Sequence, residues 1–144
     1  MLTAFLEEGS RGLCAEIDEP LAGYAWIQFG GRYVFGRNGK LEIPPKYAIV
    51  KNLWVSPEFR GQNIGQKLNA ARLALVPAGH IPMVFIIPEN RYAIRNWERH
   101  KFQRVLEINE WRWFKGAWKM NVKHLTESPE AESLVSALER GNKG

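Results

Sequence analysis

A short segment in the middle of the chain combines an apolar run, a glycine-containing loop and a stretch with helical spacing. Residues 53–55 are Leu-Trp-Val, and the loop that begins at Arg60 contains two glycines and an asparagine. Apolar residues then recur at helical spacing, at Ile64, Leu68, Ala71 and Leu75. The pattern predicts a strand, a tight loop and a helix. Such a loop directs backbone N–H groups and the positive end of the helix at one point, so the segment predicts a phosphate or pyrophosphate site.

An ordinary strand-to-helix turn that binds nothing has similar glycine content, so composition alone leaves both readings open. The residue order is more specific. It resembles the acyl-CoA-binding signature of the Gcn5-related N-acetyltransferase (GNAT) superfamily, a strand ending in Val-x-Pro followed by Arg/Gln-x-x-Gly-x-Gly/Ala. Arg60, Gly65 and the strand match, whereas Asn63 stands where the first glycine is usual. If that position needs a positive φ, asparagine is the most tolerant residue after glycine, although its side chain would crowd a phosphate.

A second motif lies downstream of the loop. After the next strand the superfamily carries Asn-x-x-Ala-x-x-x-Tyr-x-x-x-Gly-Phe, and Asn90, Ala93 and Phe102 stand at the corresponding positions. Two motifs at the expected separation are more specific than either alone, and the resemblance extends over residues 9–123. It implies an α/β protein with a single-domain GNAT-like acyl-CoA N-acyltransferase fold, a mixed central sheet and splayed parallel strands.

The resemblance also implies a cosubstrate and a set of contacts. The cosubstrate would be acetyl-CoA (coenzyme A), with no metal, and an amine would attack its thioester directly, helped by approximation and a backbone oxyanion contact. Asn90 and the backbone of Leu53, Trp54 and Val55 would contact the pantetheine arm. The loop amides would hold the pyrophosphate, from Arg60 through Gly61, Gln62, Asn63, Ile64 and Gly65 to Gln66.

The usual catalytic positions depart from the superfamily pattern. Trp97 stands where a tyrosine typically protonates the departing thiolate, and an indole N–H is not a comparable acid. Lys51 lies near the position at which many members carry a glutamate used as base or water relay. Tyr92, on the same predicted helix, is the remaining candidate for a catalytic acid. The simpler interpretation is that Tyr92 is a packing residue.

These departures leave two functions open. The first is an N-acetyltransferase that transfers an acetyl group from acetyl-CoA to a primary amine of unknown identity, a small molecule or a protein. The alternative is a non-catalytic GNAT-fold binding or structural module that lacks the usual acid and base. Retention of the loop and of Asn90 favours the first, and loss of both catalytic positions favours the second.

Composition and charge argue against a membrane-spanning, secreted, disulfide-bonded or nucleic-acid-binding protein. No apolar run approaches the roughly 20 residues that span a bilayer, and the first residues lack the features of a signal peptide, so we expect a cytoplasmic protein with no membrane partner. The single cysteine, Cys14, precludes an internal disulfide. The net charge of +5 suits coenzyme A. Nucleic acid is the less favoured anion, because basic residues are scattered and the alternation at Trp111, Trp113 and Trp118 is typical of core.

Further signals place these motifs on an α/β series of elements. We predict a helical turn over residues 5–8, strands over 13–17, 21–29, 47–55 and 81–87, and helices from the loop to about residue 76, over 90–100 and after Ser128. We also predict a hairpin with a type I′ turn at Asn38-Gly39, and a second of residues 103–114 and 117–123 with a bulge or twist near Asn109 and Glu110. Lys51 and Asn52 interrupt an apolar strand, which indicates a strand end, a bulge or a site.

The two ends of the chain carry separate expectations. We assign residues 1–127 to a GNAT-like domain and residues 128–144 to a C-terminal amphipathic helix and tail. Members of the superfamily usually begin with a strand and a helix for which this chain leaves no room, so the strand over 13–17 would be an exposed edge. We expect the tail helix, a second copy of the chain in a homodimer or another partner to cover that edge.

Overall fold

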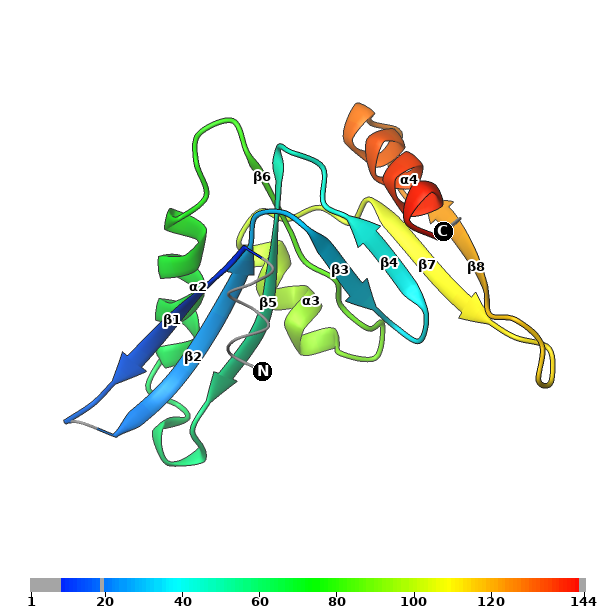
Figure 1. The fold of residues 1–144 in the computed structure, drawn as a ribbon. Coiled ribbons are helices and arrows are strands. Elements are labelled where there is room, and N and C mark those ends of the chain that lie inside the picture. Colours follow the sequence, from blue (N-terminus) through cyan, green and yellow to red (C-terminus); the bar gives the residue numbers. More distant parts are fainter. Residues whose placement is uncertain (1–8, 19, 143–144) are drawn as a thin grey trace. The chain divides into compact units, whose positions relative to one another are not determined.

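A computed structural model describes residues 9–18 and 20–142 (Figure 1). The chain divides into two compact units. Met1–Gly31 and Ile43–Val84 make up the first, and Arg32–Glu42 and Phe85–Gly144 make up the second. In the described residues the first unit holds a four-stranded sheet and the second holds two two-stranded sheets. The helical turn predicted over residues 5–8 lies outside the described residues.

The sheet of the first unit is mixed, as predicted. β1 (Ser10–Glu16) and β2 (Leu21–Gln28), which correspond to the first two predicted strands, pair antiparallel, and β2 also pairs antiparallel with β5 (Tyr47–Val55). β5 pairs in parallel with β6 (Ile81–Met83), which gives the order β1-β2-β5-β6. β5 begins and ends at the predicted residues, and β1 lies at the edge of the sheet as expected.

β6 is shorter than the strand predicted over residues 81–87. Its pairing with β5 ends at Met83, and residues 84–87 are irregular. An apolar run indicates burial and does not require a ladder, which is why the prediction extends too far. Phe85 already belongs to the second unit, and its ring packs against Tyr33 and Phe35 of the same unit, with centroid distances of 5.1 and 4.7 Å.

α2 (Ile64–Ala74) follows β5 and packs against β1, β2 and β5 of its own unit (Figure 1). Leu68 is buried, as the apolar spacing predicts, but Ala71 is exposed. The buried face continues through Asn69 and Arg72, which are 2% and 3% exposed. The spacing thus predicts the helix and misplaces the second half of its inner face, because polar side chains with internal hydrogen bonds occupy it.

β3 (Arg32–Phe35) and β4 (Gly39–Glu42) form the hairpin predicted in this region. Its turn is not the predicted type I′, because neither Asn38 nor Gly39 has a positive φ. The left-handed residue is Gly36, with a φ of 58°, and the loop between the strands has three residues.

A carboxylate from a later strand explains the different turn. Glu110 accepts hydrogen bonds from the backbone N–H groups of Arg37 and Asn38, with N···O distances of 2.6 and 3.1 Å. Gly36 lies against the same carboxylate, and a Cβ at this position would overlap it. A contact between distant segments therefore selects a turn that the local Asn-Gly pair does not encode.

β7 (Leu106–Trp111) and β8 (Lys119–His124) form the second predicted hairpin, and their register has no shift. Of the bulge or twist predicted near Asn109 and Glu110, the bulge is therefore absent. Leu106 and Ile108 alternate on one side of this strand, whereas Trp111 and Trp113 follow the other alternation. These two tryptophans do so because they are not core residues, being 48% and 76% exposed. These two rings lie outside the core, contrary to the prediction.

α3 (Arg91–Arg99) and α4 (Pro129–Asn142) are the predicted helices of the second unit. The Ser128 Oγ accepts a hydrogen bond from the Ala131 N–H at 3.1 Å, which confirms the predicted serine cap. α4 packs against β4 (Figure 1). Its buried side chains form the predicted amphipathic stripe, consisting of Ala131, Leu134, Ala137 and Leu138.

Candidate functional site

The end of β5 follows a break in its pairing with β2. Trp26 pairs with Lys51 and Tyr24 pairs with Trp54, so two residues of β5 lie opposite one residue of β2. Asn52, inside this bulge, has a φ of 49°, a left-handed conformation that asparagine tolerates. The polar interruption of the strand is thus a bulge, one of the three predicted causes.

Beyond the bulge, the residues predicted to contact the coenzyme are partly or largely exposed. The side chains of Leu53 and Trp54 are 42% and 37% exposed. β6 pairs with β5 only as far as Ile49 and Met83, so it contributes no partner to residues 50–55. The parallel ladder of this unit therefore leaves unused the edge along which an extended ligand would add as a strand.

Two contacts with β2 fix the end of β5. A Cβ at Gly23 would lie 2.6 Å from the Trp54 carbonyl oxygen, so only glycine permits the observed approach of the two strands. The Tyr24 ring stacks on the Trp54 ring with a centroid distance of 5.4 Å. The strand is therefore held on its β2 side and open on the other side within this unit.

The loop after β5 has the predicted strand-loop-helix order. A short 3-10 helix (Pro57–Phe59) follows β5, and α2 begins at Ile64. Among the described residues no side chain caps α2, and its first turn holds no acidic residue. The first N–H groups of a helix have no acceptor within it, and they carry the positive end of its dipole. This helix start therefore suits an anion, and Arg60 and Lys67 add positive charge near it.

Asn63, which departs from the superfamily signature, has a φ of 59° and a ψ of 20° directly before α2. The positive φ considered for this position is thus present. Gly61 is also left-handed, with a φ of 82° and open space where a Cβ would lie. A Cβ at Gly65 would lie 3.7 Å from the side chains of Leu53 and Val55, an ordinary contact that agrees with the glycine or alanine of the signature.

Asn90 and Tyr92 belong to the second unit. The Asn90 Oδ1 accepts a hydrogen bond from the Ala93 N–H at 3.1 Å, so Asn90 is the N-cap of α3. This cap gives the Asn-x-x-Ala spacing a structural reason. The Nδ2 group of a capping asparagine still offers two donors. Tyr92 is 78% exposed in the first turn of the same helix.

Trp97, at the position of the superfamily's catalytic tyrosine, is a core residue. It is 6% exposed and packs against Phe102 and His100, with centroid distances of 4.7 and 5.6 Å. The aromatic residue at this position therefore contributes packing to the second unit.

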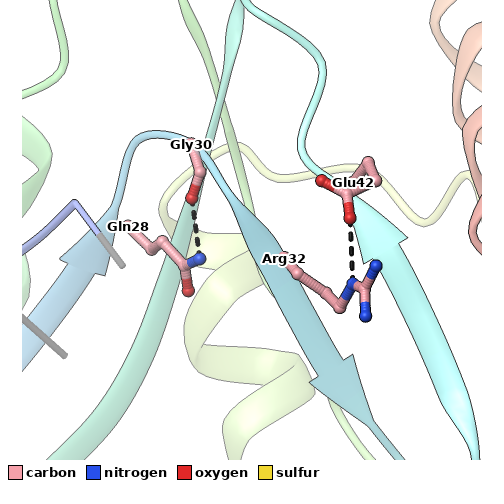
Figure 2. A network of polar contacts seen from close by, with 4 residues as sticks. All are labelled: Gln28, Gly30, Arg32 and Glu42. Atoms are coloured by element: carbon pink, nitrogen blue, oxygen red, sulfur yellow. Dashed lines mark hydrogen bonds and ion pairs between the residues drawn. The ribbon is translucent and has the colours of Figure 1, made fainter. Parts of the chain in front are cut away.

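Lys51, near the position of the superfamily's glutamate, is also buried. Its Nζ donates to the Gln28 Oε1 at 2.7 Å, and Gln28 in turn donates to the Gly30 carbonyl at 2.7 Å (Figure 2). The pair of Arg32 and Glu42, also drawn in Figure 2, lies at 2.9 Å across the β3–β4 ladder with both side chains more than half exposed. An exposed pair of this kind contributes little, whereas the buried chain from Lys51 fixes the turn after β2.

Arg72 is a buried charge that nothing in the apolar spacing singles out. Its Nη1 donates to the carbonyls of Trp26 and Lys51 at 3.1 and 2.9 Å, and its Nη2 donates to the Asn69 Oδ1 at 2.6 Å. Desolvation lowers the pKa of the guanidinium to about 10, so it stays protonated at neutral pH. The one signal in the sequence is position, four residues after Leu68 on the inner face of α2.

Residues 9–18 and 20–142 contain no group of three His, Cys, Asp or Glu side chains that could hold a metal ion. In that same part of the chain, no helix is both long and apolar enough to cross a membrane. Cys14 is exposed on β1.

A family model covers most of the chain. The model described as the acetyltransferase (GNAT) family matches residues 2–102, a range that includes the loop, Asn90 and Phe102. A search of the curated proteins finds no match.

Solved structures with similar folds extend the comparison. Protein smu.2055 from Streptococcus mutans UA159 is 16% identical, with a TM-score of 0.57 over 87% of this chain and 76% of that one. Aminoglycoside N-acetyltransferase AAC(6')-Iy in complex with CoA is 19% identical, with a TM-score of 0.54 over 72% of this chain and 78% of that one. A mutant of protein BH1408 from Bacillus halodurans is 16% identical, with a TM-score of 0.52 over 71% of this chain and only 64% of that one. This chain thus spans slightly less than two thirds of BH1408, and identities this low show the fold alone.

Proposed function

The chain belongs to the acetyltransferase (GNAT) family, and on that premise we propose that it transfers an acetyl group from acetyl-CoA to a primary amine. The observation that carries the proposal is the end of β5. There a bulged strand with an open edge leads into a loop in which Asn63 is left-handed and the start of α2 is uncapped. An open strand edge suits an amide-containing arm, and an uncapped helix start suits a pyrophosphate.

The residues present fit coenzyme A in this proposal. The amides of residues 60–66 would bind the pyrophosphate, and the backbone of residues 53–55 would pair with the pantetheine arm. Asn90, in the second unit, keeps Nδ2 donors for the pantetheine contact that the superfamily pattern implies for it. When bound, acetyl-CoA supplies an acyl group already activated as a thioester. The protein then has to hold the amine against that group and donate to its oxygen, which positioning and backbone N–H groups can achieve without a protein nucleophile.

Proton transfer in this reaction requires a group other than Trp97 or Lys51, because both are buried in structural contacts. Tyr92 is the residue of α3 that we assign to protonation of the departing thiolate. Its phenol is exposed and lies in the helix that Asn90 caps. Loss of this hydroxyl in Tyr92→Phe should lower kcat about 10- to 100-fold with little change in the KM for acetyl-CoA, as expected for a general acid.

Calorimetric titration with acetyl-CoA is the first test of the proposal. We expect binding, followed by release of free thiol when a panel of amines is added, including an aminoglycoside, a polyamine, an amino acid and a peptide with a free amino terminus. The aminoglycoside is included because a structural neighbour acts on that class by name. Absence of binding at millimolar coenzyme would contradict the proposal. Binding with no turnover of any amine would favour the non-catalytic module.

Substitution of Asn63 tests the placement of the pyrophosphate. Glycine adopts a φ of 59° without steric cost and removes the side chain beside the loop amides, so Asn63→Gly should tighten acetyl-CoA binding about threefold. Asn38→Gly, in the turn between β3 and β4, controls for a general effect of replacing a loop asparagine by glycine. Unchanged or weaker binding by Asn63→Gly would argue against a pyrophosphate at this loop.

A further inference from the structure

One side chain connects three elements of the first unit at the β5 bulge. Arg72 projects from α2, and a single nitrogen, Nη1, donates to the Trp26 carbonyl of β2 and to the Lys51 carbonyl of β5. Trp26 and Lys51 are the last paired residues before the register shifts. The guanidinium therefore binds both strands at the point where the ladder between them is interrupted.

The carbonyls at this point accept from a donor outside the ladder. A bulge removes regular pairing, and a buried carbonyl without a partner is costly. An arginine is suited to the position because its planar group presents several N–H donors in fixed directions, and Asn69 holds that plane by accepting from Nη2 at 2.6 Å. A lysine would offer one rotating ammonium in place of this fork.

The same side chain relates the strand to the loop. α2 begins at Ile64, directly after the loop, and carries Arg72 two turns later on its buried face. The start of α2 and the strand beyond the bulge are thus both fixed with respect to one guanidinium. If the register of β5 moved by one residue, every side chain and backbone group beyond the bulge would change face.

We propose that Arg72 is a positioning residue that fixes the register of β5 beyond the bulge, and so aligns the strand for the pantetheine arm with the loop for the pyrophosphate. This role rests on the proposed use of coenzyme A. Arg72 touches no reacting atom in the proposal and acts through the strand.

Amide hydrogen exchange tests the structural half of this proposal without any ligand. In Arg72→Met and Arg72→Lys, the amides of residues 52–55 should exchange at least about tenfold faster than in the parent protein, and the amides of β1 should change little. Ile49→Ala is the matched control, because it removes a fully buried side chain of β5 and leaves the Arg72 hydrogen bonds intact. Faster exchange spread equally over the sheet in all three variants would overturn the proposal, since it would show only a general loss of stability.

Two ligands test the functional half. Coenzyme A contains the pantetheine arm, whereas adenosine 3′,5′-bisphosphate lacks it and retains a phosphate for the loop. In Arg72→Met we expect the Kd for coenzyme A to rise about tenfold or more and the Kd for the bisphosphate to change less than about twofold. The Kd of Arg72→Lys for coenzyme A should fall between those of the parent protein and Arg72→Met. An equal loss of affinity for both ligands, or none for coenzyme A, would overturn the proposal.

Together, the hydrogen-exchange and binding experiments distinguish failure of this proposal from failure of the proposed function. If the parent protein binds neither ligand, coenzyme use is wrong and the alignment role falls with it. Localised exchange at residues 52–55 would then still assign Arg72 to the register of β5. If the parent binds coenzyme A and exchange in the Arg72 variants is not localised, the function stands and the positioning role is wrong.

Discussion

Two charged side chains hold irregular backbone in this chain, and they do so with opposite chemistry. In the first unit, Arg72 donates to two carbonyls at a bulge between β2 and β5. In the second unit, Glu110 accepts from two N–H groups in the turn between β3 and β4. The bulge presents carbonyl acceptors to α2 and the turn presents N–H donors to β7, so each site uses a side chain of the complementary charge.

The two sites differ in burial, and this difference decides how strongly each backbone irregularity depends on its charged side chain. Arg72 is 3% exposed, whereas the hydrogen bonds of Glu110 lie in an exposed turn. Water can replace Glu110 as an acceptor for the turn, but it cannot easily reach the carbonyls at the bulge. We therefore expect the bulge to depend on its charged residue more strongly than the turn does.

The largest expected effect is the loss of the buried guanidinium. Arg72→Met leaves the carbonyls of Trp26 and Lys51 without their donor, and it should lower the free energy of unfolding by about 3 kcal/mol. Urea unfolding followed by circular dichroism measures this change. A loss below about 1 kcal/mol, no larger than for an ordinary exposed hydrogen bond, would remove the contrast between the two sites.

An intermediate effect is expected at the turn. Gly36→Ala introduces a Cβ that overlaps the Glu110 carboxylate at a φ of 58°, and it should cost about 2 kcal/mol. Gly61→Ala is the matched control, because Gly61 is also left-handed, at 82°, but has open space around the new Cβ. It should cost about 1 kcal/mol from backbone strain alone. Equal losses in the two variants would show that contact with Glu110 adds nothing at Gly36.

The smallest expected effect is on the pH dependence of folding stability, to which Tyr33 of the second unit and Arg72 of the first contribute in different ways. Burial raises the pKa of Tyr33, on β3, above 10.0, so the unfolded chain ionises this phenol first. The stability from the neutral phenol is complete below pH 10 and is lost as pH rises through the folded pKa. Arg72 acts in the opposite sense above about pH 10, because there the unfolded chain holds the extra proton.

The difference in urea midpoint between the parent and Tyr33→Phe, followed from pH 8 to pH 11, isolates the contribution of Tyr33. The advantage of the parent protein should shrink above pH 10, and the tyrosinate absorbance that Tyr33→Phe removes should have its midpoint above pH 10. A constant difference over this range would contradict a raised pKa for Tyr33.

The parts of the fold that follow from local pattern could be predicted from the sequence. The bounds of β5, the start of α2, the Ser128 cap and the positive φ at Asn63 depend on side chains within a few residues of the feature. Apolar spacing, capping oxygens and backbone sterics act at that distance. The same local character explains why the predicted strand-loop-helix order of this segment agrees with the structure.

The failed predictions depend on contacts between distant segments. The turn at Asn38-Gly39 is changed by Glu110, more than 70 residues later in the chain. The parallel strand after residue 83 is lost where Phe85 packs on the rings of β3. Arg72 has no apolar signal because its burial is compensated by carbonyls of two other strands. A single sequence contains these partners but not their pairing.

The insertion of β3 and β4 between β2 and β5 has a consequence for synthesis of the protein. The chain passes from one unit to the other after Gly31, after Glu42 and after Val84, so the first unit can close once β6 has been made. Leu41 of β4, which is 0% exposed, belongs to the strand against which α4, the last helix, packs. On the ribosome Leu41 therefore lacks this cover until α4 has been translated, and in that interval its apolar side chain adds to the risk of aggregation.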